Sequence, residues 1–160
     1  MKEQTNSKPQ EGKARTIRKT FSRETSVQTT IFADPAIVWA LLTRASDFPR
    51  WNSTVTSIHG DIRQGETVEL KSTLDEKRTF KLKIKEFVQE KRLVWGDSQG
   101  NRVYTIDKTN GSGILFRMSE KIGGPLFPLF ASYIPPFDES FERFAADLKK
   151  EAESIQKTKE

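Results

Sequence analysis

The sequence predicts an α+β domain in which a curved antiparallel sheet of about six to seven strands wraps around one long C-terminal helix. Two observations support this fold class. Short segments between residues 54 and 118 alternate apolar and polar side chains, with turn signals between them. Residues 137–155 instead carry an apolar stripe with the period of a helix. This helix is the only predicted element long and apolar enough to cover the inner face of the sheet.

One strand and two short helices are predicted before that sheet. Residues 24–32 alternate apolar and polar side chains, as a half-buried strand does. Asp34 and Pro35 then end the strand and begin a helix, with Asp34 as its N-cap and Pro35 in its first helical position. Residues 47–52 read as a second, short helical turn that brings two aromatic side chains together.

The strands that follow are short and joined by tight turns. Phe80, Leu82 and Ile84 alternate with lysines, which indicates a strand with one solvent-facing side. Asn110 and Gly111 form the clearest turn signal, because both residue types tolerate positive φ. Connections this short predict an antiparallel meander. The predicted strands are 66–74, 80–85, 91–95, 102–106 and 114–118.

The chain then crosses a segment rich in Gly and Pro, residues 122–136, which is expected to be neither strand nor helix. One interpretation makes it a lid packed flat on the core. Another makes it a portal, with Gly123 and Gly124 as the hinge, or a surface that touches a membrane or a partner. The terminal helix follows, with acidic residues in its first turn and Lys149 and Lys150 near its end, as the helix dipole favours.

Composition excludes several kinds of site. The chain has no cysteine and a single histidine, His59. A disulfide scaffold, a thiolate metal centre and a cysteine nucleophile are therefore excluded, and neither a metal nor a cofactor is expected. His59 and Asp61 could share one face of a strand as a general base and its partner, but a surface histidine is the favoured interpretation.

The net charge of +5 lies in the N-terminal segment. Residues 1–23 carry seven Lys and Arg and two Glu, whereas basic and acidic side chains balance in residues 24–160. We expect residues 1–23 to form a flexible basic tail and residues 24–157 to form a single domain. A neutral domain lacks the charge of a nucleic-acid binder, so any weak contact with an anionic membrane or a partner falls to the tail. No apolar leader or span is visible, which favours a cytoplasmic protein.

Two stretches resemble a known superfamily. ADPAIVWALLTRASDFPRWN (33–52) has the order of a strand end, Asp-Pro, a helix with Val-Trp and Leu, and then Pro and Trp-Asn; GGPLFPLF (123–130) precedes an amphipathic helix. Both are similar to the START/Bet v 1-like (SRPBCC) superfamily, the helix-grip proteins that include polyketide cyclase/dehydrase-like and lipid-transfer domains. The resemblance covers roughly residues 24–155. It implies a cavity between sheet and helix that takes lipids, sterols, polyketides or quinones.

The candidate cavity residues are large side chains on the expected inner faces. Most aromatic residues on such faces belong to a core, and the proposal for a ligand site rests on the set as a whole. Tyr104, Tyr133, Asp107 and Glu120 are the polar groups that would orient a ligand if they reach the cavity. The predicted lining residues are Trp39, Trp51, Leu70, Phe80, Leu82, Ile84, Trp95, Tyr104, Phe116, Met118, Phe130, Tyr133, Phe137 and Phe141.

Three functions remain open at this point. The first is a carrier or sensor that binds a hydrophobic small molecule in the cavity. The second is an enzyme of the cyclase/dehydratase kind that uses the same cavity, although no catalytic constellation stands out in the sequence. The third is an interaction module whose core is filled by its own side chains.

Overall fold

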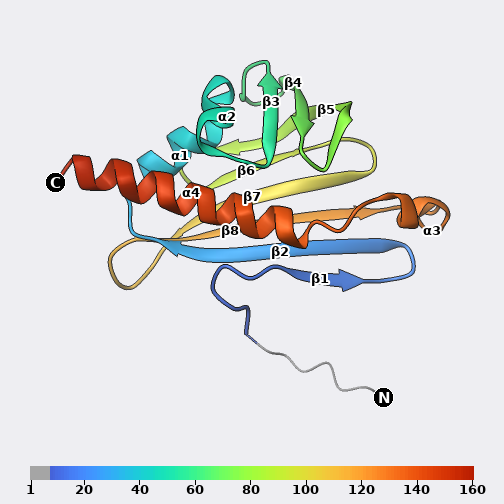
Figure 1. The fold of residues 1–160 in the computed structure, drawn as a ribbon, viewed down its shortest axis with the longest axis horizontal. Coiled ribbons are helices and arrows are strands. Elements are labelled where there is room, and N and C mark those ends of the chain that lie inside the picture. The colour runs from blue at the N-terminus through green and yellow to red at the C-terminus, as the bar shows by residue number, and fades with distance from the viewer. Residues whose placement is uncertain (1–7) are drawn as a thin grey trace.

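The computed structural model describes residues 8–160 (Figure 1). An eight-stranded antiparallel sheet, in the order β1-β2-β8-β7-β6-β5-β4-β3, curves around the C-terminal helix α4 (Asp138–Thr158). The predicted fold class is therefore confirmed. The strands are β1 (Arg15–Arg18), β2 (Ser22–Ile31), β3 (Val55–His59), β4 (Thr67–Ser72), β5 (Asp75–Val88), β6 (Arg92–Gly96), β7 (Gly100–Lys108) and β8 (Ile114–Gly123).

Strands β3 to β8 form the predicted meander, in which each strand pairs with the next. The sheet continues when β8 pairs with β2 along its whole length, from Ser22 opposite Gly123 to Ile31 opposite Ile114. The first long strand of the chain is thus joined to the last. This pairing places the beginning of β2 next to the end of β8, from which the chain continues toward α4.

Strand β1 lies in the segment that we expected to be a flexible tail, and here the structure differs. Arg15–Arg18 pairs with β2 at the edge of the sheet. The Thr16 hydroxyl donates to Asp138 Oδ1 at 2.7 Å, and the Ala14 N–H donates to Glu142 Oε1 at 3.1 Å. Both acceptors lie on α4, far along the chain, so no local pattern in residues 1–23 reveals the strand. Residues 1–7 of the expected tail lie outside the described residues.

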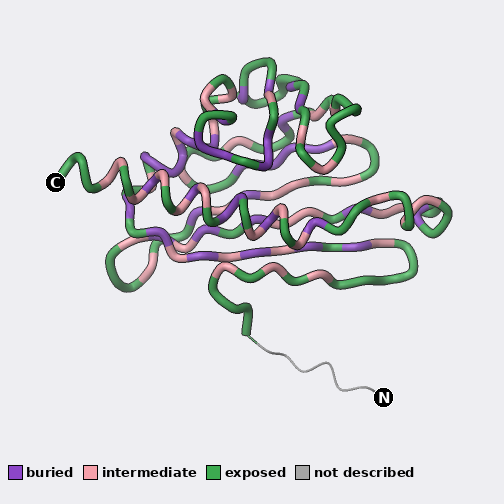
Figure 2. The backbone as a smooth tube through the Cα atoms, in the orientation of Figure 1, coloured by how far each residue is buried: buried purple, intermediate pink, exposed green. Residues whose placement is uncertain are grey.

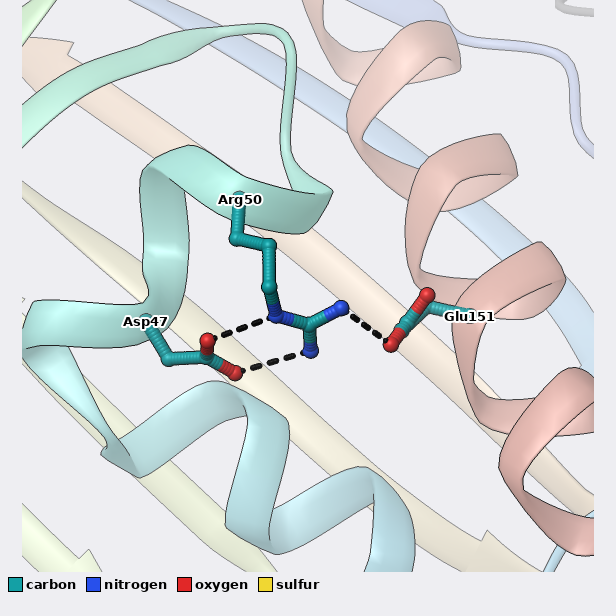
Figure 3. Close-up of polar contacts among 3 residues, drawn as sticks. All are labelled: Asp47, Arg50 and Glu151. Carbon is teal, nitrogen blue, oxygen red and sulfur yellow. Dashed lines mark hydrogen bonds and ion pairs between the residues drawn. The ribbon is translucent and has the colours of Figure 1, made fainter.

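Two helices follow β2, as predicted. Helix α1 (Pro35–Thr43) begins directly after Asp34, whose side chain makes no cap hydrogen bond, and α2 (Phe48–Trp51) follows a short 3-10 turn. Figure 3 shows how α2 is joined to α4: Arg50 Nε donates to Asp47 Oδ1 and Arg50 Nη1 donates to Glu151 Oε1, each at 2.7 Å. Because Arg50 is exposed, these ion pairs add little stability. The packing of α2 on α4 rests on its buried aromatic side chains, with the Trp51 and Phe144 ring centroids 5.8 Å apart.

Helix α4 buries one face in the concave side of the sheet, which is the core of the molecule (Figure 2). Phe141, Phe144 and Leu148 on this face are fully buried. The Phe144 ring stacks on Tyr104 with the ring centroids 5.5 Å apart. The apolar stripe predicted from the helical period therefore faces the sheet.

The segment between β8 and α4 is more regular than predicted. Strand β8 continues to Gly123, and α3 (Phe127–Phe130) and a 3-10 turn (Ala131–Tyr133) follow. Proline at the start of α3 fits its first turn, where the missing N–H costs no hydrogen bond. We refer to residues 124–136 as the cover.

Candidate ligand-binding cavity

A cavity of about 170 Å³ lies between the sheet and the beginning of α4. Its walls come from β3 to β8 and from α4, and residues Tyr133, Ile134 and Pro135 of the cover border it. The lining residues are Thr54, Val55, Leu70, Ser72, Leu74, Asp75, Arg78, Phe80, Leu82, Trp95, Gly96, Asp97, Gln99, Gly100, Arg102, Glu120, Ile122, Tyr133, Ile134, Pro135, Phe137 and Ser140.

The apolar wall follows from the period of the strands. Successive side chains of a strand point to opposite faces, so Phe80 and Leu82 of β5 share the face that holds Leu70 of β4. Leu70 lies opposite Phe80 across the two strands. Trp95 of β6 and Phe137 before α4 complete this wall, and both are buried. The wall can therefore bind an apolar surface of a ligand.

A charged pair lies on the sheet side of the cavity. Arg102 of β7 and Glu120 of β8 are direct partners across the strands, and Arg102 Nε donates to Glu120 Oε1 at 2.9 Å. Their side chains are 14% and 18% exposed. The guanidinium carbon of Arg102 lies 5.0 Å from the centre of the Phe141 ring, so α4 covers the pair from above. This bond uses one of the five N–H donors of the guanidinium.

Arg102 keeps its charge in this position. Burial alone lowers the pKa of its guanidinium, but Glu120 and the oxygen of Tyr104 raise it by more, and the net pKa lies above the ordinary value for arginine. The side chain therefore acts as a fixed hydrogen-bond donor and positive charge. It has no role as a proton donor at any physiological pH.

Tyr104 lies behind this pair, in the core. Its hydroxyl is buried and makes no hydrogen bond of acceptable geometry with any described residue. Burial raises the pKa of the Tyr104 hydroxyl to about 12, although the nearby positive charge of Arg102 lowers it. At neutral pH Tyr104 is thus a neutral hydroxyl, and its ring packs edge-on to Trp95 at 5.2 Å between centroids.

A buried arginine holds the cover in place. Arg23 of β2 is 4% exposed and donates to the carbonyl oxygens of Ile134 at 3.2 Å and Pro135 at 2.9 Å. Its guanidinium carbon also lies 4.8 Å from the centre of the Phe137 ring. Burial, followed by the nearby charge of Arg18, lowers the pKa of Arg23. The edge of the cavity therefore depends on a side chain from the opposite end of the sequence.

The structure brings together part of the predicted lining set. Leu70, Phe80, Leu82, Trp95, Tyr133 and Phe137 line the cavity. The other predicted residues, which do not border it, are Trp39, Trp51, Ile84, Tyr104, Phe116, Met118, Phe130 and Phe141. Most of these pack in the core or on its edge; for example, Trp39 contacts Phe87 and Phe130 contacts Phe127. The role of the lining residues in ligand binding stays a prediction.

The remaining polar candidates separate clearly. Glu120 and Tyr133 border the cavity, whereas Asp107 is exposed on the other face of β7. His59 and Asp61 are exposed and lie outside the cavity wall.

The two glycines of the expected hinge lie where β8 ends. Gly124 has φ +142°, directly after β8. A side-chain carbon at Gly123 would lie 2.6 Å from the Phe21 carbonyl oxygen. Their role as a hinge stays a prediction.

Arg102 is the site residue that the sequence analysis missed. It lies two positions before Tyr104 and four before Ile106, which both face the core. Strand period alone therefore predicts that Arg102 points inward. The signal in the sequence is that Arg102 is a charged residue at a position whose neighbours on the same face are apolar. Arg23 carried the same signal two positions before Thr25, but it lay in the segment interpreted as a tail.

The described residues lack two further features. Residues 8–160 contain no group of three or more His, Cys, Asp or Glu placed to hold a metal ion. None of the helices in this part of the chain combines the length and the apolar character needed to cross a membrane.

The comparisons with known proteins agree on the fold. Residues 22–153 match the family model described as polyketide cyclase/dehydrase and lipid transport. A search of curated proteins finds no significant match.

Three solved structures illustrate the likeness. A conserved protein of unknown function from Enterococcus faecalis superposes with a TM-score of 0.64 at 14% identity, covering 89% of this chain and 78% of that one. A START superfamily protein from Mycobacterium smegmatis gives 0.60 at 12% identity, covering 82% and 98%. A protein from the dynemicin biosynthetic locus gives 0.64 at 12% identity, covering 83% of this chain and 48% of that one.

Proposed function

Because this chain belongs to the polyketide cyclase/dehydrase and lipid transport family, we propose that it binds one compact hydrophobic molecule in the cavity, as a carrier or sensor. The observation that carries this proposal is the cavity itself, with apolar side chains on one wall and the Arg102–Glu120 pair on another. Ligand sites are typically apolar pockets with a few placed polar groups. The cavity has that composition.

The size of the cavity limits the ligand. Its volume of about 170 Å³ is below the roughly 300 Å³ at which most sites for drug-sized ligands begin. A single ring with a short substituent fits this space, or the end of a longer chain whose remainder lies under the cover. A ligand as large as a whole sterol requires the cover to move. We therefore favour a compact ligand, held by about 4 to 8 kcal/mol, which corresponds to a Kd between about 1 mM and 1 μM.

The charged pair selects the polar end of the ligand. Arg102 and Glu120 neutralise each other, so a ligand carboxylate placed beside them would meet the negative charge of Glu120. A neutral hydroxyl can accept a hydrogen bond from the guanidinium and donate one to the carboxylate. We therefore expect a phenol or an alcohol to bind more tightly than the corresponding hydrocarbon, by about three- to tenfold for one added hydrogen bond.

Binding is favoured over catalysis by the state of the buried groups. Arg102 keeps its proton because its pKa is raised. Tyr104 keeps its proton at neutral pH because its pKa is about 12. General acid–base catalysis needs a group whose pKa lies near the working pH. Arg102 is therefore suited to position a ligand and not to move its protons, and Tyr104 lies behind it without bordering the cavity.

Native mass spectrometry of protein freshly purified from cells, followed by organic extraction, tests the proposal. A stoichiometric hydrophobic ligand that is released on extraction supports a carrier or sensor. The extracted protein is then offered ethylbenzene, 4-ethylphenol and 4-ethylbenzoate. Tighter binding of the phenol than of the other two supports the role of the charged pair. If the purified protein has the mass of the chain without ligand and binds none of the three compounds, the proposal is contradicted.

A further inference from the structure

Exposed apolar side chains concentrate at one end of the molecule. In the described chain the most exposed large hydrophobic residues are Tyr133 at 83%, Leu129 at 75%, Leu126 at 64% and Phe21 at 58%. We call these four residues the apolar tip. Phe21 belongs to the turn between β1 and β2, and the other three belong to the cover. Exposed apolar groups gathered in this way mark a contact surface.

The backbone shows that the two parts of the apolar tip lie side by side. The Gly124 N–H donates to the carbonyl oxygen of Phe21 at 3.0 Å, directly before the segment that carries Leu126 and Leu129. Figure 1 shows the β1–β2 turn and α3 at the same end of the molecule. One partner surface can therefore contact the exposed side chains of both segments.

The charges around the apolar tip identify the partner. No charged residue occurs from Ile122 to Phe137. Two exposed basic residues precede Phe21: Arg18 ends β1, and Lys19 lies in the β1–β2 turn. Leucine and aromatic side chains beside a basic pair are the composition that binds at the interface of an anionic lipid bilayer. A protein partner would have to supply both an apolar face and acidic groups at one place.

We propose that the apolar tip, together with Arg18 and Lys19, docks the protein on an anionic lipid bilayer. The apolar side chains enter the headgroup region, and each basic residue near the surface strengthens binding by about fivefold. Tyr133 belongs to both the apolar tip and the cavity border, so docking brings the cavity to the bilayer surface. Exchange of a ligand with the bilayer rests on the proposed function, whereas docking itself does not.

Co-sedimentation of the full chain with lipid vesicles tests docking. We compare phosphatidylcholine vesicles with vesicles that also contain phosphatidylglycerol, each at low and high salt. The wild-type protein is expected to bind the anionic vesicles and to bind less at high salt, because screening weakens the basic contribution. Absence of binding to the anionic vesicles at low salt would overturn the proposal.

Matched variants locate the surface. Phe21→Asp and Leu129→Asp are expected to weaken vesicle binding by about tenfold or more. Phe32→Asp is the control, because Phe32 is 54% exposed but lies at the other end of β2. Circular dichroism and urea unfolding establish that each variant is folded. Equal loss in the Phe32 variant would overturn the proposal.

Charge variants separate the apolar tip from the rest of the basic N-terminal segment. Arg18→Gln with Lys19→Gln is expected to reduce binding to anionic vesicles while weak binding to neutral ones is unchanged. If the Phe21→Asp and Leu129→Asp variants both bind vesicles as the wild type does, charge alone holds the protein on the vesicle. The proposed docking surface is then contradicted. The proposal also fails if sedimentation shows a dimer that only Leu129→Asp disrupts, since the tip is then a contact between copies.

Discussion

Arg102 and Glu120 are two charged side chains beside an apolar wall. Their pairing offsets the free-energy cost of burying each charge. Each side chain is mostly buried, and each provides the partner that the other needs. Phe141 covers the guanidinium face. Removing one partner leaves the other charge buried and unpaired, which costs far more than the pair itself contributes.

Arg102→Met is therefore expected to destabilise the fold by about 2–4 kcal/mol, because it strands Glu120. The double variant Arg102→Met with Glu120→Leu should recover most of that loss, since no buried charge remains. Urea unfolding of the wild type, both single variants and the double variant measures the coupling. A double variant whose loss equals the sum of the two single-variant losses would show that the pair is not coupled, contrary to its geometry.

Tyr104 gives a prediction about pH. The pKa of its hydroxyl is about 12 in the folded protein against 10.0 for an ordinary tyrosine. Between these values the unfolded chain loses the proton and the folded chain keeps it, so stability falls as the pH rises through this window. Below pH 10 the folded and unfolded chains both keep the proton. Tyr104 then makes no contribution to the pH dependence of the free energy of unfolding.

Tyr104→Phe removes this effect, together with a hydroxyl that has no hydrogen-bond partner among residues 8–160. We expect the variant to be as stable as the wild type or slightly more stable at pH 7. Its advantage should grow above pH 10, by roughly 1 kcal/mol for each pH unit. Urea unfolding at pH 7, 9 and 11 checks this. An advantage for the wild type that widens with pH would contradict it.

At the residue scale the sequence predicts which face a side chain occupies better than it predicts what the side chain touches. Leu70, Phe80 and Leu82 share an inward face by strand period, and all three border the cavity. Ile84 has the same period but is fully buried beyond the cavity. The position of a void along a strand depends on side chains from several elements, so the period of one strand does not contain it.

At the scale of elements, the cover is held by a residue that lies far from it in the sequence. Arg23 joins β2 to the carbonyl oxygens of Ile134 and Pro135 and packs on Phe137. The cover is also held by the Gly124 hydrogen bond to Phe21 and by Phe127, which is buried in the core. We expect the two Arg23 hydrogen bonds to determine how firmly the end of the cover, at Ile134 and Pro135, closes on the cavity.

Arg23→Met keeps the length of the side chain and removes its donors. We expect faster amide hydrogen exchange in residues 124–136, by about tenfold or more, because two hydrogen bonds of a charged donor are lost. Exchange in β5 and β6 should change little. Hydrogen exchange with mass spectrometry measures both regions in one experiment. Uniform acceleration across the sheet would mean that Arg23 supports the whole fold and not the cover.

Elements with a strong local period were predictable and those with distant partners were not. Helix α4 and strands β4 to β8 follow from apolar spacing and turn residues. Strand β1 has its partners on β2 and α4, and its own sequence is mixed and basic. The Gly and Pro residues of the cover predict an irregular segment, whereas proline is well placed at the start of the short helix α3.

At the scale of the molecule, sheet curvature and helix α4 together produce the cavity. The core is dense where Phe144 contacts Tyr104, Trp51 and Phe116. It leaves space toward the beginning of α4, where the cover replaces the helix as the roof. The resemblance seen in the sequence predicted a cavity between sheet and helix, but not its modest volume, because volume depends on how all of the layers pack.

Calorimetric titration with 4-ethylphenol tests the central claim most directly, with the wild type compared with Leu82→Trp and Leu115→Trp. Leu82 borders the cavity, so a tryptophan there fills it, whereas Leu115 faces away from the core on β8 and provides the same substitution as a control. Thermal unfolding establishes that both variants are folded. We predict one binding site in the wild type, a Kd in the millimolar to micromolar range, at least a tenfold loss in Leu82→Trp and little change in Leu115→Trp. Equal binding by the wild type and a folded Leu82→Trp variant would contradict the claim that this cavity is the ligand site.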